Sequence, residues 1–106
     1  MRVYLAGPMS GIPDDNQREF DRAAAVLRAE GHFVLVPSSL NPPGGYRQCL
    51  AVDMAWICAH AEMVAFLPGW ENSKGARAEH ALAECLASDR ESPLAIRYLT
   101  EAEIWE

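Results

Sequence analysis

The feature that most constrains the fold is a regular alternation of short apolar runs with longer amphipathic stretches. The short runs are typical of strands, and the longer stretches have helical periodicity. The expected strands are Arg2–Ala6, Phe33–Val36, Met63–Leu67 and Leu94–Tyr98, and the expected helices are 16–30, 47–60, 73–87 and a short one after Thr100. Alternation of this kind indicates a parallel sheet with right-handed crossovers. We predict an α/β fold, a doubly wound, flavodoxin- or Rossmann-like parallel sheet of about four to five strands with helices on both faces.

Capping residues support the expected helix ends. Asn16 and Glu19 have the spacing of a capping box, as do Thr100 and Glu103 at the last helix. Gly31 is typical of the residue that follows a helix. Ser73 is a good N-cap, so the third long helix is expected to begin just after it.

Length and charge restrict the class of protein. A chain of 106 residues suits one domain, 1–106, with one core. The net charge of −6 argues against a nucleic-acid polymer as partner. No apolar run approaches the roughly 20 residues that span a bilayer, and the N-terminus leads directly into a strand pattern. We therefore expect a cytoplasmic protein with no membrane partner.

Cysteine and histidine patterns give no sign of a metal site. Cys49, Cys58 and Cys85 are odd in number and form no CxxC pair, which fits a reduced environment. We predict that they fill small spaces in the core. The histidines have no metal-ligand spacing to one another. We expect neither a metal nor another cofactor.

A loop rich in glycine and proline follows the first strand. Gly7–Pro13 contains Gly7 and Gly11, which allow tight turns and close approach of a ligand. The loop lacks the lysine and the spacing of a P-loop. By itself it is equally consistent with a simple connecting turn.

The segment Pro68–Glu79 has a second set of site features. Free backbone N–H groups after Ser73 would form an anion-binding helix mouth, and Gly75 would let a ligand approach the backbone. Gly75 and Glu79 share one helix face, so the space above Glu79 would be open. Glu79 is thus a candidate carboxylate nucleophile or base, and the alternative is an ordinary surface glutamate.

The predicted strand order brings these two segments together. The plausible strand order is second, first, third, fourth, which places the switch point between the first and third strands. Gly7–Pro13 and Pro68–Glu79 would then be neighbours at the ligand-binding edge of the sheet. Asp53 lies in the middle of the second helix, where it either faces solvent or points towards the ligand.

Three motifs together resemble the nucleoside 2-deoxyribosyltransferase superfamily, in particular its small phage and bacterial members of unassigned function. They are Tyr4-Leu5-Ala6-Gly7-Pro8-Met9-Ser10-Gly11, the helical segment Asp53–Glu62, and Ser73-x-Gly75-x-x-x-Glu79. The resemblance covers roughly residues 2 to 98, and the last spacing is similar to that of the 2′-deoxynucleoside 5′-monophosphate N-glycosidase branch.

The resemblance implies a function and a set of site residues. Glu79 would be the nucleophile that cleaves an N-glycosidic bond or transfers a deoxyribosyl group, and Asp53 would be the second catalytic carboxylate. The implied ligand is a small nucleotide or nucleoside, most closely a 2′-deoxynucleoside 5′-monophosphate, and Ser73 would hold its phosphate. The expected substrate-binding residues are Tyr4, Gly7, Pro8, Met9, Ser10, Gly11, Trp70, Ser73 and Gly75. The family also implies a homodimer or a higher homo-oligomer, in which a neighbouring subunit completes the site.

Two alternatives remain open on the sequence. The same pocket could bind a nucleotide or a nucleotide-derived signal without cleaving it, or the domain could be structural, with a vestigial pocket. Trp70 could stack on a base or serve as a packing lid.

Overall fold

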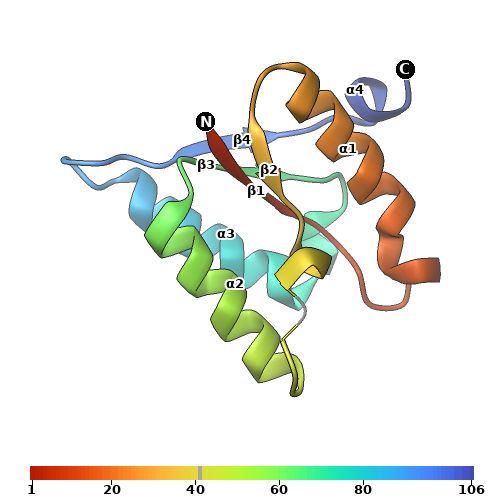
Figure 1. Ribbon diagram of the computed structural model, residues 1–106, viewed down its shortest axis with the longest axis horizontal. Coiled ribbons are helices and arrows are strands. Elements are labelled where there is room, and N and C mark those ends of the chain that lie inside the picture. The colour runs from red at the N-terminus through yellow and green to blue at the C-terminus, as the bar shows by residue number, and fades with distance from the viewer. Residues whose placement is uncertain (41) are drawn as a thin grey trace.

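The computed structural model describes residues 1–40 and 42–106 and has a four-stranded, all-parallel sheet in the order β2-β1-β3-β4 (Figure 1). The strands are β1 (Arg2–Ala6), β2 (Phe33–Leu35), β3 (Met63–Phe66) and β4 (Ala95–Tyr98), and the helices are α1 (Gln17–Ala29), α2 (Tyr46–His60), α3 (Lys74–Ala87) and α4 (Glu101–Trp105). The predicted fold class and strand order are confirmed.

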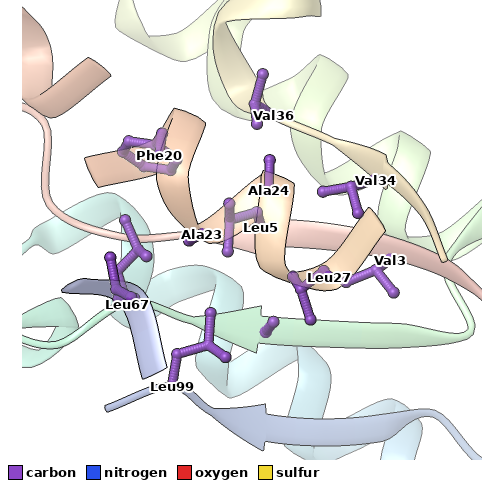
Figure 2. Close-up of a cluster of buried hydrophobic side chains, with 12 residues drawn as sticks. Val3, Leu5, Phe20, Ala23, Ala24, Leu27, Val34, Val36, Leu67 and Leu99 are labelled. Carbon is purple, nitrogen blue, oxygen red and sulfur yellow. The ribbon is translucent and has the colours of Figure 1, made fainter. Parts of the chain in front are cut away.

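Helices cover both faces of the sheet because the side chains of its central strands point alternately to the two sides. In β1, Val3 and Leu5 join one buried cluster with α1, whereas Tyr4 and Ala6 join another on the side of α2 and α3. Figure 2 shows the first cluster, in which α1 supplies Phe20, Ala23, Ala24 and Leu27. These four residues form the buried face of the helix.

β1 has the expected bounds, and each of the other three strands is one residue shorter than expected. Pro37 has no N–H and follows Val36 directly, so β2 ends at Leu35. The Leu94 amide donates to the Leu86 carbonyl at the end of α3 rather than to β3, and β4 therefore begins at Ala95. The segment between β2 and α2 contains a 3₁₀ turn at Pro37–Leu40, and Asn41 lies outside the described residues.

The predicted capping box at Asn16 is wrong. Asn16 has φ 63°, in the left-handed region, and its side chain makes no cap hydrogen bond. Its Nδ2 instead donates to the Pro8 carbonyl across the loop at 3.1 Å. Asp14 and Asp15 are also left-handed, with φ 54° and 51°, so three successive non-glycine residues have this strained conformation. The side chain that was expected to cap α1 thus fastens this turn to the glycine loop.

The other capping predictions are confirmed. Ser73 accepts a hydrogen bond from the Ala76 amide, and Thr100 and Glu103 form a reciprocal capping box at α4. Gly31 follows α1 with φ 94° and donates to the Arg28 carbonyl.

The predicted burial of the cysteines is wrong. Cys58 and Cys85 are exposed and Cys49 is only partly covered. Cys58 follows the buried Ile57. Successive side chains of a helix point about 100° apart, so Cys58 points away from the core. No helix in the described part of the chain has the length and apolar character needed to cross a membrane.

The end of the chain is firmly attached to the sheet. β4 pairs with β3, and Leu99 and Ile104 complete the cluster that contains α1. Arg97 in β4 donates to Glu30 at 2.6 and 3.1 Å and to Glu103 at 2.9 Å. These contacts join the end of α1, the edge strand and α4.

Candidate functional site

A cavity of about 750 Å³ lies beyond the C-terminal ends of β1 and β3. Its walls come from the loop after β1, from one side of α2 and from the first turns of α3. This is the switch point of the sheet, where ligands bind in doubly wound folds. The lining residues are Tyr4, Gly7, Pro8, Met9, Ser10, Asp15, Pro37, Tyr46, Cys49, Leu50, Asp53, Asn72, Ser73, Lys74, Gly75, Ala76 and Glu79.

The cavity floor holds a buried pair, Tyr4 and Glu79. The Tyr4 side chain is fully buried, and its hydroxyl donates to Glu79 Oε2 at 2.5 Å. Glu79 is only 5% exposed and is the one buried charged residue in the described part of the chain. A carboxyl group that is buried without a cation tends to remain protonated. Glu79 is therefore not the surface glutamate of the alternative reading.

Burial sets the protonation of this pair. It raises the pKa of Glu79 to about 8, the nearby Asp53 charge adds to the rise, and the hydrogen bond from Tyr4 opposes it. Burial also raises the pKa of Asp53, which is half-buried, and the Tyr4 hydroxyl opposes that rise. The pKa of Tyr4 is raised by burial and then by the charges of Glu79 and Asp53, so the phenol stays protonated. Perturbed carboxyl groups in a cleft are typical of functional sites.

The first turn of α3 forms the other end of the cavity. Ser73 Oγ accepts from the Ala76 amide at 3.2 Å and so caps the helix. Lys74 and Gly75 are the first two residues of α3. Their amides have no intrahelical acceptor, because no helical turn precedes them. Lys74 also lines the cavity and contributes a positive charge. Amides, dipole and lysine together favour an anionic ligand group here.

Gly7 lacks a side chain for a reason that the sequence did not reveal. A Cβ at Gly7 would lie 2.7 to 2.9 Å from side-chain atoms of Leu67. The close packing of the β1 and β3 ends therefore requires glycine here, in addition to any approach by a ligand. Gly11 differs, since it has φ 81° and open space where its Cβ would be.

All of the predicted site residues except Gly11 and Trp70 line the cavity. The Trp70 ring stacks on His80, with 4.1 Å between ring centroids, and also packs against Phe66. It therefore has the packing role that was the alternative on the sequence.

Sequence reasoning missed several lining residues. Asp15 reaches the cavity from the left-handed turn, and Tyr46 reaches it from the start of α2. A smaller hollow of about 270 Å³ adjoins the first, and Met9, Asp15, Pro37, Cys49 and Asp53 line both. The unusual length of the loop before α2 was the one signal for this region.

The site and the fold define a class: an α/β protein in which a buried carboxyl group and the open first turn of a helix line one cavity. The chain belongs to the family described as "Domain of unknown function (DUF4406)", which matches residues 1–89. No curated protein and no solved structure matches the chain. Within residues 1–40 and 42–106, no group of three or more His, Cys, Asp and Glu side chains could hold a metal ion.

Proposed function

We propose that this protein cleaves the N-glycosidic bond of a 2′-deoxynucleoside 5′-monophosphate, with Glu79 as nucleophile, and passes the sugar to water or to another base. One observation carries the proposal: the buried Glu79 carboxyl faces a cavity whose far end is the open first turn of α3. The volume of about 750 Å³ lies within the range of small-molecule sites. The motif resemblance to the nucleoside 2-deoxyribosyltransferase superfamily supports the same function.

The residues have chemically consistent roles. The ionised Glu79 carboxylate would attack C1′ of the sugar, and the electron pair of the C1′–N bond would leave with the base. Asp53, whose pKa is raised by burial, would protonate the departing base. Water or an acceptor base would then attack C1′ and break its bond to Glu79, which leaves as the carboxylate, while the proton of the attacking group passes to the Asp53 carboxylate. A phosphate held at Ser73 and the Lys74 and Gly75 amides would fix the sugar through binding remote from the reacting bond.

Protonation of Glu79 would control the rate. Because burial raises the pKa of Glu79 to about 8, the carboxyl group is mostly protonated at pH 7, and the Tyr4 hydroxyl stabilises the ionised form. The rate of the first step is therefore expected to rise with pH up to about 8.

The same observation favours a second candidate function. A Glu79 carboxyl that is mostly neutral at pH 7 can donate a hydrogen bond to a ligand instead of attacking it. The protein would then bind a nucleotide without cleaving it.

Product analysis separates the two functions. Purified protein is incubated with each 2′-deoxynucleoside 5′-monophosphate and its ribose counterpart, and free base is measured by chromatography. Glu79→Gln is the test variant, and Glu84→Gln, an exposed position on the same helix, is the matched control. Release of base by the parent and by Glu84→Gln, but not by Glu79→Gln, is the expected result.

Absence of free base from every substrate, with or without added acceptor bases, would refute the catalytic function. Calorimetric binding of a monophosphate under those conditions would favour the binding module. Sedimentation would test the homo-oligomer that the resemblance implies, because a strictly monomeric active protein would show that no second subunit is needed.

A further inference from the structure

Tyr46 connects the two sides of the cavity mouth. It is the first residue of α2 and is 63% exposed, yet it lines the cavity opposite the first turn of α3. Its hydroxyl oxygen lies 3.2 Å from the position that a Cβ of Gly75 would occupy, and its Cε2 lies at 4.0 Å from that position. An exposed aromatic side chain therefore reaches across to the turn whose amides are open.

This contact changes the interpretation of Gly75. The sequence suggests that the missing side chain leaves space for a ligand, but the Tyr46 hydroxyl already occupies part of that space. The hydroxyl has no hydrogen-bond partner within the described residues, whereas the Tyr4 hydroxyl donates to Glu79 and the Tyr98 hydroxyl pairs with His80. A phenol is a protonated donor at neutral pH and suits an acceptor-only group.

We propose that the Tyr46 hydroxyl is a phosphate-binding group that closes over the first turn of α3 and gives the site its preference for phosphorylated ligands. This inference rests on the proposed function, because it assumes that the phosphate of a nucleotide lies at that turn. The phosphate would accept hydrogen bonds from the Lys74 and Gly75 amides on one side and from Tyr46 on the other. An unphosphorylated nucleoside has no charged acceptor at this position, so Tyr46 would contribute little to its binding.

Calorimetry with paired ligands tests the proposal. Each 2′-deoxynucleoside 5′-monophosphate is titrated beside its unphosphorylated nucleoside, in a Glu79→Gln background that keeps the ligand intact. Tyr46→Phe should weaken monophosphate binding about tenfold or more and nucleoside binding less than about twofold. Tyr98→Phe is the matched control, because Tyr98 is also exposed but lies outside the cavity lining.

The Gly75 contact provides a second, independent measurement. In Gly75→Ala the new Cβ meets the Tyr46 hydroxyl at 3.2 Å, whereas in Gly75→Ala with Tyr46→Phe the nearest ring atom is at an ordinary 4.0 Å. If the alanine acts by displacing the hydroxyl, the double variant should bind monophosphate about as well as Tyr46→Phe alone. If the losses of monophosphate affinity in Gly75→Ala and in Tyr46→Phe add up in the double variant, the Cβ obstructs the ligand itself. That result would overturn the proposal.

The outcomes separate this inference from the function on which it rests. Equal monophosphate affinity in the parent and Tyr46→Phe would overturn the phosphate-binding role of Tyr46 and leave the proposed function intact. Failure of every monophosphate to bind the folded parent would overturn both. An equal loss of affinity for nucleoside and monophosphate in Tyr46→Phe would show that Tyr46 only maintains the shape of the cavity mouth. That result also contradicts the proposal.

Discussion

Stability should depend on pH through Glu79, and the structure gives the direction. The pKa of Glu79 is raised by burial from 4.5 to about 8, so the folded protein holds a proton there that the unfolded chain releases at lower pH. The folded state is therefore fully stabilised by this proton below about pH 4.5, and that contribution is lost as the pH rises through about 8. At about 1.4 kcal/mol for each tenfold change in proton affinity, the difference is on the order of 5 kcal/mol.

Glu79→Gln isolates this contribution. Glutamine has nearly the same shape and keeps an oxygen that can accept from Tyr4, but it does not ionise. The free energy of unfolding, measured by urea titration from pH 5 to pH 9, should fall with pH for the parent relative to the variant. The difference between them should shift by a few kcal/mol in favour of the variant, most steeply midway between the two pKa values, at about pH 6.

A matched control removes the effect of charge alone. Glu91→Gln changes an exposed glutamate in the turn before β4 and should run parallel to the parent over the whole pH range. A constant difference between the parent and Glu79→Gln from pH 5 to pH 9 would refute the reasoning, because it would show that Glu79 titrates alike in the folded and unfolded chains.

Three further substitutions have defined directions. Tyr4→Phe removes the hydrogen bond that lowers the pKa of Glu79, so that pKa should rise further in an NMR titration, and unfolding should become easier by about 1–3 kcal/mol. Asp53→Asn removes a charge that raises the pKa of Glu79, so that pKa should fall in the same NMR titration. Gly7→Ala places a Cβ against Leu67 and should destabilise the protein by about 1–3 kcal/mol in urea unfolding.

Each substitution has a clear contrary result. Movement of the Glu79 pKa in the same direction in Tyr4→Phe and Asp53→Asn would contradict the opposing effects assigned to these groups. For the glycine, Gly45→Ala is the control, since its Cβ would meet nothing within 4 Å and its φ is −95°. Equal effects of the two alanines would show that contact with Leu67 does not determine the cost.

Much of the fold could be predicted because its signals are local. Prolines follow β1 and β2 within two residues, Ser73 caps the helix that it precedes, and Thr100 and Glu103 bond to each other's backbone. Successive side chains of β1 and β3 point to opposite faces and are apolar on both, which is typical of a sheet that helices cover on both sides. The strand order was expected because it is plausible for a doubly wound fold, and the sheet has that order.

The predictions that failed depend on contacts between distant parts of the chain. Asn16 has the right residue type for a cap, but asparagine also tolerates the left-handed region, and the Pro8 carbonyl selects that state. Trp70 stacks on His80, which belongs to the next helix. The closeness of Tyr46 to Gly75 arises only when α2 and α3 pack side by side. No local pattern encodes such a pairing.

The attachment of β4 and α4 has a practical consequence for anyone preparing a shorter fragment. The family match ends at residue 89, before either element begins. A fragment cut at that boundary would leave β3 with an unpaired row of N–H and C=O groups and would uncover the cluster that Leu99 and Ile104 close. Open strands of this kind recruit other chains by edge-to-edge pairing. We expect such a fragment to aggregate, because the buried, apolar β3 would replace β4, with its charged Arg97, as the edge of the sheet.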